Sequence, residues 1–154
     1  MSTRPLGDLT IMRALEIMTP FDRTMFFPET TEEEWAPHLP WLTPRAIDPL
    51  TGQLKLYMQS YIVRTSHHTI LIDTCVGNHK SRPTRPLWDM KSDGTYLDAL
   101  ATHGVSPEDI DYVMCTHLHG DHVGWNTRLV DGEWVPTFPN ARYVLSLIHI
   151  SEPT

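Results

Sequence analysis

Three imidazoles and one carboxylate fall within six consecutive residues, in the order His-Leu-His-Gly-Asp-His. Where the end of an extended strand enters a loop, residues i and i+2 point the same way, so His117 and His119 can converge on one cation. Gly120 lets the backbone turn, which redirects Asp121 and His122 toward a second position nearby. Nitrogen and oxygen donors in this mixture suit Zn²⁺, and Fe²⁺ and Mn²⁺ also fit by ligand type. The segment therefore predicts a paired metal site.

Apolar runs identify the strands that must position this segment. Residues 111–116 form a short run centred on Tyr-Val-Met-Cys, which predicts a strand covered on both faces that ends where the histidines begin. Leu118, between two of the histidines, should then face the core. Residues 54–64 alternate between apolar and polar side chains, and residues 69–74, Thr-Ile-Leu-Ile-Asp-Thr, are short and apolar enough for a central strand, so the two segments predict a hairpin.

Capping and turn residues predict the elements that remain. Helical spacing over 96–101, with Gly104 as a C-terminal cap, predicts a helix. Residues 106–109 combine an N-cap serine, a first-turn proline and a capping-box aspartate, which predicts one short turn. The Val-Asp-Gly-Glu sequence at 130–133 predicts a tight hairpin, and residues 141–144 predict a further strand.

The N-terminal third is harder to interpret. Residues 9–18 alternate enough to be a strand, although their apolar residues also suit one face of a helix. Six prolines and several large aromatic residues fall within residues 20–50, which disfavours regular structure. We expect this Pro-rich segment to be an ordered arm or lid, and the alternative is a loop packed over the core.

The last ten residues differ in character from those before them. The stretch from Leu145 to Thr154 resembles the in-frame translation of a sequencing-library adapter. We therefore expect residues 145–154 to be a non-native tail and residues 1–144 to be a truncated domain, the N-terminal part of a longer protein. The alternative is a genuine C-terminal tail.

Composition excludes some classes of function. Twelve Lys and Arg stand against 19 Asp and Glu, and the net charge of −7 comes without a basic block, which disfavours nucleic-acid binding. The two cysteines, Cys75 and Cys115, lie in apolar runs, so we expect buried free thiols and a cytoplasmic protein. No stretch is long and apolar enough to predict export or membrane insertion.

The segment from Thr116 to Trp125, Thr-His-Leu-His-Gly-Asp-His-Val-Gly-Trp, resembles the first metal motif of the metallo-β-lactamase superfamily. The resemblance covers roughly residues 54–144. It implies an α/β fold, the αββα sandwich of that superfamily, of which this chain would supply the N-terminal half only. It also implies a metal-dependent hydrolase with two Zn²⁺ per intact site.

The same resemblance implies a role for each residue of the motif. His117 and His119 would ligate the first metal, and Asp121 and His122 the second. Asp121 would also steer the nucleophile and pass a proton to the leaving group. Asp73 would order the metal loop from behind, since a metal-bound imidazole needs its other nitrogen held. The remaining ligands of the superfamily lie later in the chain, and residues 123–144 supply none of them.

Within the superfamily the chain is most similar to the quorum-quenching lactonases. The similar features are the N-terminal arm, Gly-Asn-His-Lys at 77–80 and Gly-Trp-Asn-Thr at 124–127. An ester, lactone or phosphotriester is then the expected substrate, a small molecule, and a homodimer stays open. The alternative function is a non-catalytic metal-binding fragment or scaffold of the same fold, and the fragment itself is expected to be inactive.

Overall fold

The computed structural model describes residues 3–146. The chain divides into two compact units. Met1–Ile17 together with Met58–Thr154 form the first, called the core unit below, and Met18–Tyr57 form the second, called the arm unit. Of the expected tail, only Leu145 and Ser146 lie within the described residues.

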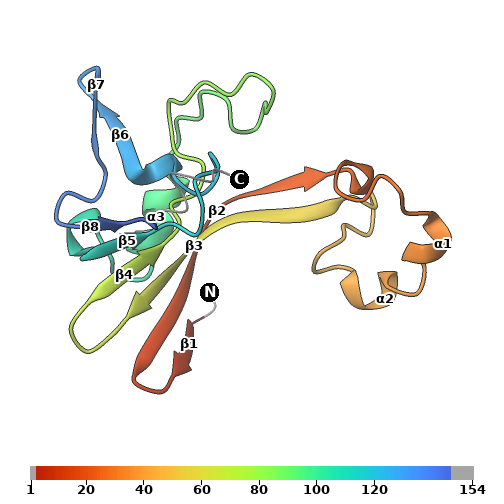
Figure 1. The fold of residues 1–154 in the computed structure, drawn as a ribbon, viewed down its shortest axis with the longest axis horizontal. Helices are drawn as coiled ribbons and strands as arrows, with labels where there is room; N and C mark the ends of the chain where they lie inside the picture. The colour runs from red at the N-terminus through yellow and green to blue at the C-terminus, as the bar shows by residue number, and fades with distance from the viewer. Residues whose placement is uncertain (1–2, 147–154) are drawn as a thin grey trace. The chain divides into compact units, whose positions relative to one another are not determined.

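A six-stranded mixed sheet dominates the structure, with the strand order β1-β2-β3-β4-β5-β8 (Figure 1). β1 pairs with β2 and β3 with β4 in antiparallel fashion, whereas β4, β5 and β8 run parallel to one another. Their bounds are β1 Thr3–Leu6, β2 Leu9–Phe21, β3 Leu54–Arg64, β4 Thr69–Ile72, β5 Tyr112–Met114 and β8 Arg142–Val144. The predicted hairpin of residues 54–64 and 69–74 is confirmed, and so is the strand that begins at residue 9.

The predicted tight hairpin at 130–133 is also confirmed, as a separate two-stranded sheet. β6 (Thr127–Val130) pairs antiparallel with β7 (Glu133–Pro136). The two turn residues, Asp131 and Gly132, have φ values of 51° and 86°. Such left-handed backbone is what a two-residue hairpin turn requires, and Asp-Gly supplies it at low strain.

The core lies between the sheet and helix α3 (Thr95–Ala101). Tyr96 and Leu100 on α3 are fully buried and pack with Leu71 of β4 and Val113 of β5. The 3-10 turns η2 (Pro107–Asp109) and η3 (Gly124–Asn126) flank this core. η2 carries the predicted capping box, in which Ser106 and Asp109 bind each other's backbone N–H groups. No helix among residues 3–146 is long and apolar enough to cross a membrane.

Residues 20–50 contain more regular structure than their prolines predict. The arm unit holds the turn η1 (Arg23–Met25) and two single-turn helices, α1 (Glu32–Trp35) and α2 (Leu39–Leu42). Thr31 and Glu34 form a capping box for α1. The proline of α2 lies in its first turn, where no backbone N–H is needed. The expectation of irregular structure is therefore wrong at these two turns, and the arm or lid role stays a prediction.

Two apolar residues beside the histidine-rich segment are more exposed than predicted. Met114 is 42% exposed, so β5 is not covered on both faces by the described residues. Leu118 is 39% exposed, and the expectation that it faces the core is wrong. The reason is local, because β5 ends at Met114 and Leu118 belongs to the loop, where the alternation of a strand no longer applies.

Candidate metal centre

Parallel pairing of β4 with β5 brings two distant segments together at one edge of the sheet. Ile72 is the register partner of Met114, so both strands end side by side. Asp73 follows β4, and its N–H donates to the Met114 carbonyl at 2.9 Å. The histidine-rich segment follows β5. Asp73 therefore shares one site with residues that lie 43 or more positions later in the sequence.

Asp73 organises this edge. Its carboxylate accepts hydrogen bonds from the Thr116 N–H at 2.8 Å and from the Thr116 hydroxyl, and lies 2.9 Å from His122 Nδ1. Asp73 has a φ of 58°, which few residues other than Gly, Asn and Asp adopt readily. The carboxylate holds one nitrogen of His122, so the Nε2 nitrogen of that ring is left to face the site.

The two histidines that alternate along the loop do converge. His117 Nε2 lies 3.1 Å from His119 Nδ1, and the two ring centroids are 4.6 Å apart. Two nitrogens bound to one tetrahedral zinc at about 2.0–2.1 Å would lie about 3.3 Å from each other. The observed separation is therefore close to what a shared ion requires.

The other two predicted residues lie beside this pair. His122 Nε2 is 3.5 Å from Asp121 Oδ2, and the His122 ring centroid is 3.9 Å from that of His117. Partial burial, followed by the neighbouring His122 and His119, lowers the pKa of His117 and favours its neutral form. All five residues predicted from the sequence thus lie in one cluster.

Backbone contacts hold the two loops of the site against each other. The Thr74 N–H donates to the His122 carbonyl at 2.7 Å, and the Gly124 N–H donates to the Cys75 carbonyl at 2.8 Å. A Cβ at Gly124 would lie 1.9 Å from the Val76 carbonyl oxygen, and one at Gly77 would lie 2.4 Å from that of Gly124. Glycine is needed at both positions because the backbones touch.

A buried carboxylate supports these loops from the sheet. Glu16 of β2 accepts hydrogen bonds from the Val76 N–H at 2.7 Å and from Trp125 Nε1 at 2.8 Å. Lys91 Nζ lies 3.0 Å from the same carboxylate, and both side chains are almost fully buried. Sequence reasoning missed Glu16. The available signal was a lone acidic residue in register with the inward-facing Met12 and Ala14 of its strand.

An arginine contacts the histidine-rich segment. Arg82 donates from Nη2 to the Gly120 carbonyl at 2.7 Å and from Nη1 to the Val76 carbonyl at 2.8 Å. Sequence reasoning placed this residue only in a polar loop, because no local pattern shows which carbonyls a guanidinium will reach. The two cysteines are buried free thiols, as predicted.

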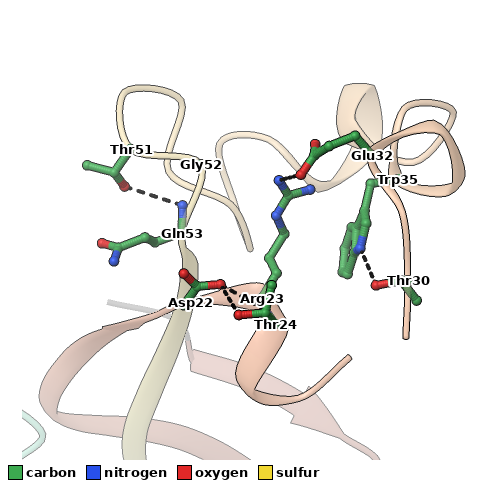
Figure 2. A pocket seen from close by; sticks show the side chains of 9 residues that line it. All are labelled: Asp22, Arg23, Thr24, Thr30, Glu32, Trp35, Thr51, Gly52 and Gln53. Carbon is green, nitrogen blue, oxygen red and sulfur yellow. Dashed lines mark hydrogen bonds and ion pairs between the residues drawn. The ribbon is translucent and has the colours of Figure 1, made fainter. Parts of the chain in front are cut away.

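A separate cavity of about 250 Å³ lies within the arm unit (Figure 2). Arg23 reaches across it to Glu32 at 2.6 Å and lies over the ring of Trp35, whose Nε1 donates to Thr30 Oγ1. Figure 2 shows the turn of Thr51, Gly52 and Gln53 on the opposite side. No residue of the histidine-rich segment lines this cavity.

The donor set of the histidine cluster fits a metal ion by its chemistry but does not enclose one. Within residues 3–146, no group of three or more His, Cys, Asp and Glu side chains is arranged to hold an ion. The chemistry of the cluster nevertheless fits one, since it presents imidazole nitrogens in pairs and a carboxylate beside them. Residues 3–146 therefore provide pairs of donors rather than a complete coordination shell.

The family model described as the metallo-beta-lactamase superfamily matches residues 57–151, more than half of the chain. The chain belongs to this superfamily. The expected α/β class is confirmed, because the chain combines a mixed sheet with a helix packed on it and matches the model of this superfamily.

Two solved structures resemble this chain over almost its whole length. A probable metal-dependent hydrolase from Staphylococcus aureus has a TM-score of 0.73 at 24% identity, over 97% of this chain and 50% of that one. AidC, described as a dizinc quorum-quenching lactonase, has a TM-score of 0.71 at 21% identity, over 96% of this chain and 45% of that one. At these identities the likeness shows the fold alone.

Curated relatives match this member of the superfamily over shorter stretches. The lactamase-like protein vrtG of Penicillium aethiopicum is 32% identical over 113 residues, which are 68% of this chain and 32% of that protein. Metallo-beta-lactamase domain-containing protein 1 of Mus musculus is 58% identical over 31 residues, 20% of this chain and 12% of that protein. The chain thus spans about half of the solved structures and a third or less of these curated relatives.

Proposed function

We propose that the intact protein is a metal-dependent hydrolase that acts on an ester, lactone or phosphotriester through a pair of Zn²⁺ ions. The observation that carries the proposal is the convergence of His117 Nε2 and His119 Nδ1 to 3.1 Å. Fe²⁺ and Mn²⁺ also suit these donors. Membership of a superfamily that includes metal-dependent hydrolases supports the reaction class.

In this proposal each pair of neighbouring donors holds one ion. His117 and His119 hold the first through the nitrogens that face each other. Asp121 and His122 hold the second, and Asp73 fixes the His122 ring by its hydrogen bond to Nδ1. A neutral imidazole is required at each position, because a protonated ring has no lone pair for the ion.

When bound, the ions supply a water whose pKa is lowered toward about 7 and polarise the oxygen of the bond to be broken. Asp121 then has a second task. Its side chain is 21% exposed, so it can take a proton from the attacking water and pass it to the leaving group. Asp73 is more enclosed and engaged by Thr116 and His122, which suits it to holding rather than to proton transfer.

A small neutral substrate fits the charge of the chain better than a nucleic acid. The chain carries a net charge of −7, and clustered cations are what phosphate backbones require. The names of similar structures support the ester or lactone class, since AidC is described as a lactonase with a bound homoserine product. A cytoplasmic location belongs to the same proposal, because two free cysteines suit a reducing compartment, and a homodimer stays open.

The first experiment measures the metal that the chain binds. The chain is expressed with zinc available, and His117→Ala/His119→Ala is compared with the wild type by elemental analysis. We expect the double variant to lose the first ion. His67→Ala is the matched control, because this histidine is exposed in the β3–β4 turn. Equal metal content in wild type and double variant would contradict the proposal.

The alternative is a metal-binding scaffold without catalysis. It predicts the same metal content but no turnover. Hydrolysis of an acyl-homoserine lactone and of a chromogenic ester by the zinc-loaded, full-length protein separates the two. Zinc-loaded protein that is inert toward both substrates would favour the scaffold.

A further inference from the structure

Arg82 contacts the turn that lies between the two predicted donor pairs. Its Nη2 donates to the Gly120 carbonyl at 2.7 Å. A Cβ added at Gly120 would lie 3.1 Å from Arg82 Nε, so the guanidinium packs directly against this residue. The contact places a fixed cation at the middle of the segment.

The carbonyl that Arg82 holds belongs to the peptide between Gly120 and Asp121. Gly120 separates His119, which belongs to the first donor pair, from Asp121, which belongs to the second. Rotation of this peptide changes ψ of Gly120 and φ of Asp121, and so changes the direction in which Asp121 leaves the backbone relative to His119. A hydrogen bond to a charged donor restrains that rotation more strongly than one to a neutral donor.

Arg82 is itself held in place. Its backbone N–H donates to Asp89 Oδ1 at 2.5 Å, and its second terminal nitrogen, Nη1, donates to the Val76 carbonyl at 2.8 Å. Glu16 in turn fixes the Val76 peptide. Arg82 therefore joins the turn of the metal loop to a backbone that the buried carboxylate of β2 already anchors.

The geometry points to Arg82 as a positioning residue that bridges the Val76 and Gly120 carbonyls and so sets the direction of Asp121 relative to His119. The role rests on the proposed metal site. A planar guanidinium is suited to it, because its two terminal nitrogens point in fixed directions and can bind two carbonyls at once, whereas a lysine ammonium is a single point charge.

The test compares Arg82→Met and Arg82→Lys with Arg85→Met. Arg85 is the matched control, because it lies in the same loop, is exposed, and its guanidinium carbon lies 5.9 Å from the centroid of the Trp88 ring. Arg82→Met removes both the charge and the bridge, while Arg82→Lys keeps the charge and loses the two-pronged donor. The full chain is used throughout.

The first measurement needs no metal. Amide hydrogen exchange of the metal-free chain is followed at His122, whose N–H donates to the His119 carbonyl at 2.9 Å. We expect exchange in residues 117–123 to be about tenfold faster in Arg82→Met than in Arg85→Met, while exchange in β3 stays unchanged. Equal exchange in the two variants would overturn the inference.

The second measurement concerns the ions. Zinc affinity is measured by competition with a chelator, and the visible absorption of the Co²⁺-loaded chain reports the ligand geometry. Loss of a group that orients ligands typically lowers metal affinity about 10–100-fold, and we expect this for Arg82→Met together with an altered cobalt spectrum. Arg85→Met should match the wild type in both respects.

The outcomes separate the two claims. A wild type that binds neither zinc nor cobalt contradicts the proposed function, and hydrogen exchange then still decides whether Arg82 holds the turn. A wild type that binds metal, with Arg82→Met equal to it in affinity and cobalt spectrum, overturns the role of Arg82 alone. Full recovery by Arg82→Lys would also overturn it, because charge rather than the bridge would then suffice.

Discussion

At the scale of single residues, the site depends on side chains that accept an unusual backbone. Asp73 has a φ of 58° and still uses its carboxylate to bind Thr116 and His122. Asn tolerates the same backbone, so Asp73→Asn changes the charge and one acceptor without adding strain. The residue thus offers a clean test of the support given to the His122 ring.

We expect Asp73→Asn to weaken zinc binding about 10–100-fold, because His122 Nδ1 loses its charged acceptor. Competition titration of the purified chain measures the effect. Asp131→Asn is the matched control, since Asp131 also has a positive φ, 51°, and lies in the β6–β7 turn. Equal losses in the two variants would show that the effect does not come from His122.

A second prediction at the scale of single residues concerns Gly124. Its missing Cβ would meet the Val76 carbonyl oxygen at 1.9 Å, and that partner is backbone, which cannot rotate away. We expect Gly124→Ala to lower the free energy of unfolding by about 3 kcal/mol or more, the upper end of what overpacking costs. Urea denaturation measures it.

The control for this substitution is Gly7→Ala. Gly7 has a φ of 58°, but no atom lies within 4 Å of the position of its Cβ. Backbone strain alone should cost about 1 kcal/mol there. A Gly124→Ala variant no less stable than Gly7→Ala would contradict the close approach of the two loops.

At the scale of elements, the periodic segments could be predicted and their long-range partners could not. Alternation over 54–64 gave the bounds of β3, and Ser106 with Asp109 gave the capping box of η2. These features depend only on neighbours in the chain. The contacts of Glu16 join it to residues 60 and 109 positions away, which no local pattern encodes.

The candidate site likewise has features that the local sequence predicts and features that depend on distant contacts. The spacing of its histidines was sufficient to predict that His117 and His119 converge. The exposure of Leu118 and Met114 was not predictable, because the sequence does not show where β5 ends or which segments cover it. The role of Arg82 was equally hidden, since its bonds are to backbone carbonyls that any sequence presents.

The prediction at the scale of elements concerns Glu16. Glu16→Ala would leave Lys91 without this partner, and would leave the Val76 N–H and Trp125 Nε1 without their acceptor in the core. Removing one member of a buried ion pair costs about 3–5 kcal/mol, and we expect a loss of that order in the free energy of unfolding. Chemical denaturation at neutral pH measures it.

The matched control is an ion pair of the arm unit. Glu32 pairs with Arg23 at 2.6 Å, but its side chain is 76% exposed. Exposed pairs contribute about 1 kcal/mol or less, so Glu32→Ala should change stability little. A loss in Glu16→Ala no greater than that in Glu32→Ala would show that the buried network does not anchor the loops.

At the scale of the whole molecule, one apolar row crosses the parallel strands and is only partly covered by the described residues. Met114 pairs in register with Ile72 on one side and with Val144 on the other. Met114 is 42% and Val144 41% exposed. Strand β8 also ends the sheet order, so its outer edge has no ladder partner among residues 3–146. Exposed apolar faces and open edges both favour association.

We therefore expect the chain to self-associate as its concentration rises. Size-exclusion chromatography with light scattering measures the mass, and Met114→Lys should reduce association because it places a charge in the middle of the row. Leu87→Lys, at a residue 52% exposed in the loop before α3, is the control and should have no effect. A wild type that stays monomeric at all concentrations would contradict this expectation.

The contact between Gly77 and Gly124 sets a limit for protein engineering. A mutagenesis library aimed at new substrates should leave both codons unchanged, because every larger side chain there would force apart the two chain segments that carry Asp73 and His122. Diversity is better placed at exposed positions from residue 83 to residue 87, which lie in the same loop and leave that junction intact.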